Sequence, residues 1–144
     1  MTFLLDTNVV SEMRRMRIDA NVAAWVDEQD PSDQFISTIT IMEIEIGILQ
    51  LERRDTRQST RLRRWLEELV LPNFDGRILP IDTEVALKCA GLHVPDPRPE
   101  RDAMIAATAL VHGLTMVTRN TADFAPTGVP LLNPWDERDL RPPE

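Results

Sequence analysis

Apolar residues along this chain are grouped in two ways, as short continuous runs and as longer segments with helical spacing. The short runs predict buried β-strands over residues 2–5, 34–38, 77–81, 114–118 and 129–132. The segment after the second run places Ile41, Ile44, Ile48 and Leu51 along one helix. Because predicted strands and helices alternate, we expect an α/β fold with a mostly parallel central sheet of about five strands flanked by helices.

Polar residues and prolines at the ends of these segments set the expected helix boundaries. The strand over 2–5 runs into residues 6–8, which are expected to cap a helix that begins near Val9. Pro99 suits the first turn of a helix over 100–112. The other helices are expected to begin at Asp19, at Thr40, near Thr56 and after Asp82.

Length and composition indicate one globular domain. The chain has 144 residues, of which 42% are hydrophobic and 28% charged, as is ordinary for such a domain. Cys89 is the only cysteine, and no apolar run approaches the roughly 20 residues that span a bilayer. We therefore expect a cytoplasmic protein without a secretory signal or a membrane segment. Residues 1–133 are expected to form the domain, with 134–144 as a peripheral polar tail.

The charge is acidic overall, and the basic residues are almost all arginine. A net charge of −8 argues against a nonspecific nucleic-acid coat. It does not exclude a nuclease, because a metal site needs acids and substrate binding needs only a local basic patch. Lys88 is the only lysine. Arginine binds phosphate oxygens well, although a bias in coding sequence accounts for the excess equally well.

Four acidic residues stand beside apolar runs, near places where a strand or turn leads into a helix: Asp6, Glu43, Asp102 and Asp123. Such positions matter because open α/β sheets bind ligands at the carboxyl ends of their strands. Each acid also has an adequate structural explanation, as a helix cap, as part of a capping box with Thr40, or as a turn residue. Asp19 and Asp82 show the same local pattern, so position alone does not separate a site from a cap.

Convergence of the four acids would point to a bound cation. Two carboxylates about 4 Å apart repel by about 4 kcal/mol at an effective dielectric near 20, so a cluster is costly without a counter-ion. Oxygen ligands are those that Mg²⁺ and Mn²⁺ prefer, and the chain holds only two histidines and one cysteine. The expected site is therefore a Mg²⁺ or Mn²⁺ centre, which is a first indication of a nuclease.

Ordered motifs along the chain resemble those of the PIN-domain ribonucleases, and among them the VapC-type toxins of toxin–antitoxin modules, including the FitB-like branch. The motifs are Leu5-Asp6-Thr7-Asn8 with Ser11-Glu12, Thr40-Ile41-Met42-Glu43 with Gly47, Asp102-Ala103-Met104-Ile105-Ala106-Ala107-Thr108-Ala109, and Thr118-Arg119-Asn120 with Asp123-Phe124. The resemblance covers nearly the whole chain. It implies a PIN-like three-layer sandwich.

The resemblance also implies which residues would act. It implies one pocket lined by Asp6, Glu43, Asp102 and Asp123, with Asp6 and Asp102 as main metal ligands and the other two acids as ligands directly or through water. Asn8, Thr118 and Asn120 would orient ligands or water from behind these acids. The implied activity is Mg²⁺- or Mn²⁺-dependent cleavage of RNA with a 5′-phosphate product. The implied partners are a VapB-type antitoxin, which occupies a groove near the pocket, and a second copy of the chain, in a homodimer or a larger complex with antitoxin.

Two alternative functions remain at this stage. A phosphoaspartyl phosphatase or receiver domain would also place an aspartate after the first strand, but it needs a lysine near the pocket. A non-catalytic PIN-like assembly module would share the fold, although it has no reason to keep a repulsive cluster of acids.

Six arginines form a patch at helical spacing between residues 53 and 64: Arg53, Arg54, Arg57, Arg61, Arg63 and Arg64. The patch predicts either contact with phosphate or a partner, or a solvated face paired with nearby acids, which the sequence favours. Trp25 and Trp65 are expected in the core or at an interface.

Overall fold

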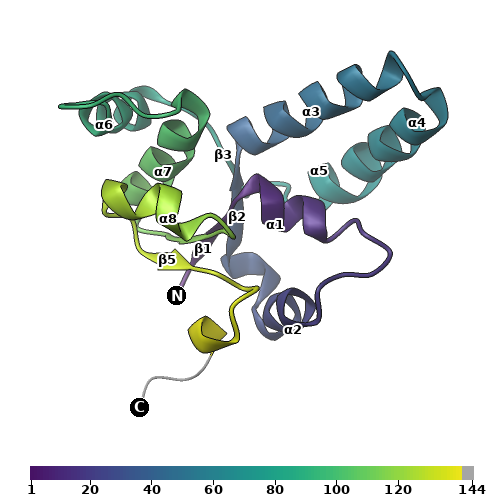
Figure 1. The fold of residues 1–144 in the computed structure, drawn as a ribbon, viewed down its shortest axis with the longest axis horizontal. Coiled ribbons are helices and arrows are strands. Elements are labelled where there is room, and N and C mark those ends of the chain that lie inside the picture. The colour runs from purple at the N-terminus through teal and green to yellow at the C-terminus, as the bar shows by residue number, and fades with distance from the viewer. Residues whose placement is uncertain (141–144) are drawn as a thin grey trace.

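The computed structural model describes residues 1–140, which form one five-stranded parallel sheet surrounded by helices (Figure 1). The strands are β1 (Phe3–Leu5), β2 (Gln34–Ser37), β3 (Ile78–Leu79), β4 (Thr115–Val117) and β5 (Leu131–Leu132). Their order is β3-β2-β1-β4-β5, and every neighbouring pair is parallel. β1 is thus central, and its carboxyl end lies between those of β2 and β4. The predicted α/β class is confirmed.

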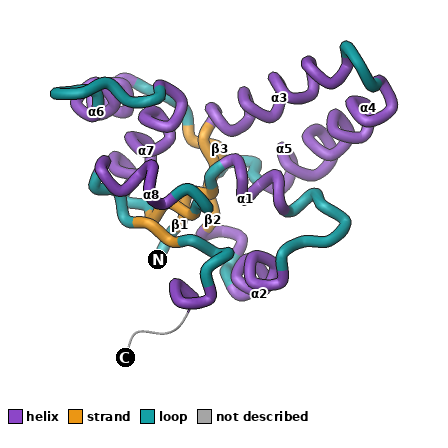
Figure 2. Tube along the Cα trace, in the orientation of Figure 1, coloured by secondary structure: helices purple, strands orange, loops and turns teal. Residues whose placement is uncertain are grey.

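Helices enclose this sheet from both sides, so that the strands occupy the middle of the molecule in Figure 2. The helices are α1 (Thr7–Glu12), α2 (Ala20–Glu28), α3 (Thr38–Glu52), α4 (Thr56–Trp65), α5 (Leu71–Asn73), α6 (Thr83–Leu92), α7 (Glu100–His112) and α8 (Thr121–Phe124). A π-helical stretch, Leu66–Val70, continues α4 into α5, and short 3₁₀ turns lie at Pro31–Asp33, Ala125–Thr127 and Glu137–Leu140. None of the helices within residues 1–140 combines the length and the apolar character that crossing a bilayer requires.

Two apolar cores form because side chains of a strand alternate between the faces of a sheet. Phe3 and Leu5 of β1 enter a core with α1, α2 and the α3–α4 hairpin, where Phe3 meets the edge of the Trp25 ring with centroids 4.9 Å apart. Leu4 points the other way and packs with α7 and α8, including Ile105. A third cluster joins α6 to α7. This three-layer packing is the one that the motif resemblance implied.

Several predicted boundaries were wrong, and one correction bears on the site. α3 begins at Thr38, not at Thr40, because the Ser37 hydroxyl accepts a hydrogen bond from the Ile39 backbone N–H at 3.0 Å and caps the helix. Thr40 is therefore inside the helix and fully buried. The capping-box explanation for Glu43 consequently fails, and this acid lies in the second turn of α3 without a capping role.

The other corrections are smaller. α1 begins at Thr7, two residues before the predicted start, with Asp6 itself as the N-cap. The strands are shorter than the apolar runs, and the turn that contains Asp123 is the short helix α8. In the predicted tail, Trp135 and Leu140 pack against the first core, while residues 141–144 lie outside the described residues.

Candidate active site

Asp6 lies at the carboxyl end of the central strand, where it makes two different hydrogen bonds. Its Oδ1 accepts from the Thr7 backbone N–H at 2.8 Å, which caps α1, and its Oδ2 accepts from the Thr118 hydroxyl at 2.7 Å. Thr118 follows β4, the strand next to β1. The side chain of Asp6 is thus fixed from two elements, and the residue is only 6% exposed.

The charge environment distinguishes Asp6 from an ordinary cap. Burial raises the pKa of Asp6 from 3.8 to about 6, against the lowering effect of its hydrogen bonds from Thr118 and Thr7. The negative charges of Asp102 and Glu43 raise this pKa further. Three of the four predicted acids therefore lie close enough to repel one another.

Two other capping aspartates provide an internal comparison. Asp19 accepts hydrogen bonds from the backbone N–H groups of Asn21 and Val22 and caps α2, while Asp82 caps α6 through Val85. Neither is among the groups that raise the pKa of Asp6 or Asp102. The three aspartates thus share the same capping pattern in the sequence, but only Asp6 lies near other acids of the candidate site.

Glu43 reaches the site from α3 and is held at both carboxylate oxygens. Thr7 donates from its hydroxyl to Glu43 Oε1 at 2.8 Å, and the Arg101 guanidinium lies 3.6 Å from Glu43 Oε2. Because Thr7 also begins α1 directly after Asp6, its backbone contacts one acid and its side chain the other. Thr7 and Arg101 were not predicted as site residues. In the sequence, the only indication of their role is that Thr7 follows Asp6 and Arg101 precedes Asp102.

Asp102 and Asp123 complete the group from the other side of the sheet. Asp102 is half-buried in the first turn of α7, and burial, Glu43 and Asp123 raise its pKa, while the Arg101 guanidinium lowers it. Asp123 is exposed on α8. Both acids line a cavity of about 200 Å³ together with Arg98, Pro99, Ala103, Phe124 and Thr127.

The three predicted orienting residues meet at the hydroxyl of Thr118. Asn8 donates from its side-chain amide to Thr118 Oγ1 at 3.3 Å, and Asn120 donates from its backbone N–H to the same atom at 3.1 Å. Thr118 in turn donates to Asp6. Asn8 also accepts a hydrogen bond of 3.5 Å from the Arg119 backbone N–H. Thr118 is fully buried, so this network sets the direction of the Asp6 carboxylate.

The donor set of the four acids suits a hard divalent cation. The acids supply oxygen only. Burial and, after it, the neighbouring negative charges raise the pKa of Asp6 and of Asp102, and a bound cation would oppose this. Within residues 1–140, no three acidic, histidine or cysteine side chains stand close enough together to enclose an ion. Mg²⁺ is usually held by one or two carboxylates together with waters and substrate phosphates, and so does not require a cluster of three.

Lys88, the lysine on which a phosphoaspartyl mechanism would depend, lies elsewhere. It belongs to α6 and lines a surface cavity between α6 and α7 with Glu84, Leu87, Gly91, Leu110 and Val111. None of the four acids lines that cavity. The arrangement therefore gives no support to an acyl-phosphate chemistry at Asp6.

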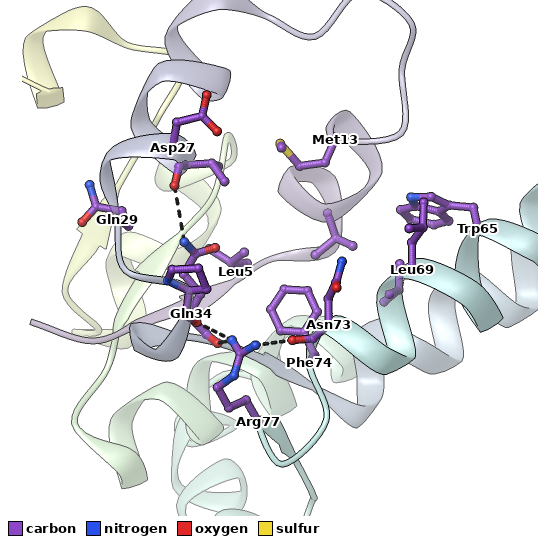
Figure 3. A pocket seen from close by; sticks show the side chains of 14 residues that line it. Leu5, Met13, Asp27, Gln29, Gln34, Trp65, Leu69, Asn73, Phe74 and Arg77 are labelled. Carbon is purple, nitrogen blue, oxygen red and sulfur yellow. Dashed lines mark hydrogen bonds between the residues drawn. The ribbon is translucent and has the colours of Figure 1, made fainter.

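A separate cavity of about 550 Å³ is mainly apolar (Figure 3). Leu5, Met13, Trp65, Leu69 and Phe74 contribute to its walls, and no acid of the candidate site does. Arg77 extends along one side, where its guanidinium donates to the backbone oxygens of Gln34 and Asn73 and lies over the Phe74 ring. This cavity suits an apolar side chain from another segment better than a charged substrate.

Comparison with known proteins gives a consistent result. The PIN domain family matches residues 3–128. The chain is 37% identical to Toxin FitB of Neisseria gonorrhoeae over 93% of this chain and 99% of that one, and 35% identical to VapC ribonuclease Y4jK of Sinorhizobium fredii over 92% and 97%. The crystal structure of FitAcB from Neisseria gonorrhoeae superposes with a TM-score of 0.85 at 37% identity, covering 93% of this chain and 99% of the other.

Proposed function

This chain belongs to the PIN domain family, and on that premise we propose that it is the toxin of a toxin–antitoxin pair, a ribonuclease that hydrolyses RNA with the help of Mg²⁺ or Mn²⁺. The observation that carries the proposal is the gathering of Asp6 from the end of β1, Glu43 from α3 and Asp102 from α7, close enough that the charges of the other two raise the pKa of Asp6 beyond the effect of its burial. A purely structural use of the fold gives no reason for such a cluster.

Asp6 and Asp102 are the residues that would hold the cation. When bound, the cation neutralises charge on the phosphate and lowers the pKa of a water. Asp6 is aimed by its two hydrogen bonds, from Thr118 and Thr7, so little side-chain ordering is needed on binding. Asp123 lies on the exposed side of the same cavity as Asp102, where it can hold a ligand water or a second ion.

Glu43 is suited to receive the proton of the attacking water. Its Oε1 accepts from Thr7 and its Oε2 faces Arg101, so the carboxylate has a fixed orientation. Thr7 and Arg101 are positioning residues in this scheme. Asn8 and Asn120 act indirectly, because both donate hydrogen bonds to the hydroxyl of Thr118, which in turn donates to Asp6.

The partner of the proposed toxin is an antitoxin, as in the similar toxin–antitoxin complex from Klebsiella pneumoniae. We propose that an apolar segment of the antitoxin occupies the cavity of Figure 3, because the lining of that cavity is mainly apolar and Leu69, at its rim, is half exposed. The homodimer stays a prediction. A cytoplasmic location is also proposed, in agreement with the single free cysteine, Cys89, which is buried.

RNA cleavage by the purified chain tests this function directly. The unmodified chain is expected to cut RNA in Mg²⁺ or Mn²⁺ and to stop in EDTA. Asp6→Asn retains a side-chain oxygen that can cap α1 but removes the charge, and is expected to lower the rate by at least a hundredfold. Asp82→Asn makes the matched change at a cap outside the site and should cleave normally. Full activity of Asp6→Asn, or activity that is indifferent to EDTA, would contradict the proposal.

A further inference from the structure

A groove runs from the candidate active site along α1, α3 and α4. Its first part has a volume of about 320 Å³, and Thr7, Ser11, Glu43 and Gly47 are among its walls. A second part of about 410 Å³ adjoins it, and the two share Arg14, Gln58, Leu62 and Trp65. Because Thr7 and Glu43 are hydrogen-bonded to each other beside Asp6, the groove begins at the proposed reaction centre, passes Trp65 and reaches Arg61 in its second part.

Three arginines line this groove. Arg14 belongs to the loop after α1, Arg54 to the turn between α3 and α4, and Arg61 to α4. All three are exposed, and none forms an ion pair within residues 1–140. We call these three residues the groove arginines.

Three neighbouring arginines that do not line the groove form ion pairs. Arg63 lies 2.6 Å from Glu45 and 3.6 Å from Glu52, Arg64 lies 4.0 Å from Glu68, and Arg15 lies 3.1 Å from Glu12. The arginine patch between residues 53 and 64 is thus divided. Arg63 and Arg64 form ion pairs on the surface, and Arg53 and Arg57 are unpaired within the described residues but lie outside the groove. Arg54 and Arg61 join Arg14 to give an unpaired positive wall on a protein whose net charge is −8.

We propose that the groove arginines bind the phosphate backbone of single-stranded RNA on one side of the scissile bond. The proposal rests on the proposed ribonuclease function and assigns the path by which the substrate enters that site. When a phosphodiester bond is held at the acids, the RNA strand extends from it in both directions. The groove is open to solvent, and the groove arginines place positive charges along its wall. Guanidinium groups bind phosphate oxygens through two parallel hydrogen bonds. Trp65 lines both parts of the groove and offers an aromatic side chain of the kind on which bases stack in single-strand binding grooves.

The contacts would position the RNA rather than read its sequence, since phosphates carry no sequence information. Loss of the groove arginines should therefore weaken binding to all single strands alike. It should raise KM while changing kcat little, because none of these side chains lies among the acids. The salt dependence of binding reports the number of phosphates contacted, with a slope of about 0.7 for each contact on a single strand.

The test measures binding of a fluorescein-labelled, mixed-sequence, 20-nucleotide single-stranded RNA by anisotropy over a series of salt concentrations. The full chain is used with Asp6→Asn, so that the RNA is not cut. Adding Arg14→Ala, Arg54→Ala and Arg61→Ala is expected to make the plot of log Kd against log salt shallower by about two, and to weaken binding at low salt at least tenfold. Replacing the same three residues by lysine should restore most of the slope. Arg57→Ala, an exposed α4 arginine that does not line the groove, should leave both unchanged.

Several outcomes would overturn the proposal. The triple alanine variant could bind RNA with unchanged slope, or Arg57→Ala alone could lose as much affinity as the triple variant, which would indicate a general charge effect. Alternatively, the triple variant could bind RNA normally but escape its antitoxin, which would assign the groove to a peptide. With Asp6 intact, RNA cleavage by the parent and by the triple variant at equal KM would refute the groove and leave the ribonuclease function standing. A parent that neither binds nor cleaves RNA would refute both.

Discussion

The hydroxyl of Thr118 donates a 2.7 Å hydrogen bond to Asp6 Oδ2, across the carboxyl ends of two neighbouring parallel strands. The two residues are 112 positions apart in sequence. This bond stabilises the ionised form of Asp6 and so opposes the effect of burial on its pKa. The strand pairing of β1 with β4 thereby controls both the direction and the charge of the proposed metal ligand.

Thr118→Val removes this hydrogen bond at nearly constant volume. We expect the pKa of Asp6 to rise further, so that the acidic limb of the pH–rate profile moves to higher pH and activity near neutral pH falls about tenfold. The side-chain amide of Asn8 and the backbone N–H of Asn120 also lose their acceptor, which should cost about 1–3 kcal/mol of stability. Cleavage rates between pH 5 and 8, together with urea unfolding, measure both effects.

Thr108→Val is the control for that change. Thr108 is also fully buried, but its hydroxyl donates to the Met104 backbone oxygen within α7 at 2.8 Å. It should alter stability without moving the pH profile. Equal pH profiles for the Thr118 and Thr108 variants would show that Thr118 has only a packing role.

The sequence reveals the strand-to-helix junctions but not the pairing between them. The apolar run Phe3-Leu4-Leu5 before Asp6 predicts a buried strand and a polar junction, and both are found. Which strand lies beside β1 depends on long-range packing, so the partnership of Asp6 with Thr118 cannot be read from local pattern. In the segment Ser37-Thr38-Ile39-Thr40, three hydroxyl residues compete as caps, and the predicted start at Thr40 was wrong because β2 ends at Ser37.

The site residues likewise fall into two groups, those that the sequence reveals and those that only the fold reveals. Asp6, Glu43, Asp102 and Asp123 can be proposed from motif order, because acidic residues after apolar runs are visible in sequence. Thr7 and Arg101 escape notice because a threonine at a helix start and an arginine on a helix surface are common for other reasons. Their roles appear only when α1, α3 and α7 are brought together around Glu43.

A divalent cation should stabilise the folded chain. A ligand that binds only the native state adds about 2.7 kcal/mol at one hundred times its Kd, which corresponds to a rise in Tm of about 5–10 °C for a domain of this size. Asp6→Asn and Asp102→Asn should each reduce the rise, whereas Asp19→Asn should keep it. Thermal unfolding in EDTA and in millimolar Mg²⁺ or Mn²⁺ provides the measurement. An equal rise in all four proteins would place the cation elsewhere.

Stability of the metal-free chain should fall as pH rises through the pKa of Asp6. The folded-state pKa, about 6, lies above the ordinary 3.8, so protonated Asp6 favours the folded state. Its contribution is fully present below about pH 3.8 and is lost as pH rises through about 6. The difference between the two pKa values corresponds to about 3 kcal/mol.

Asp6→Asn isolates this contribution, because asparagine is neutral throughout. In EDTA, the free energy of unfolding of Asp6→Asn relative to the parent should increase by up to about 3 kcal/mol between pH 4 and pH 7. Urea titrations at several pH values follow the change. A difference that stays constant with pH would mean that Asp6 keeps an ordinary pKa in the folded chain.

Arg101 should act as an internal counter-charge to the acids. Its guanidinium lies 3.6 Å from Glu43 Oε2 and lowers the pKa of Asp102. Arg101→Gln is therefore expected to destabilise the metal-free chain at pH 7 by about 1 kcal/mol or less, since the arginine is half exposed. The same change should tighten cation binding several-fold, because a competing positive charge is gone. Isothermal titration with Mn²⁺ tests this, and weaker binding in Arg101→Gln would contradict it.

Leu69→Glu should separate toxin activity from neutralisation by antitoxin. Leu69 is 53% exposed at the rim of the apolar cavity, so a charged residue there leaves the fold intact but places a carboxylate where an apolar segment of the partner would pack. Losing the burial of one leucine costs about 1.5–3 kcal/mol, so affinity for the antitoxin should fall at least tenfold, while RNA cleavage by the free chain stays unchanged.

Leu87→Glu, at a leucine on α6 that is 71% exposed and outside the cavity, is the control and should still be neutralised normally. Inhibition of RNA cleavage by increasing amounts of antitoxin compares the three proteins. If Leu69→Glu is inhibited as strongly as the parent, the antitoxin binds another surface, and the cavity of Figure 3 loses its proposed occupant.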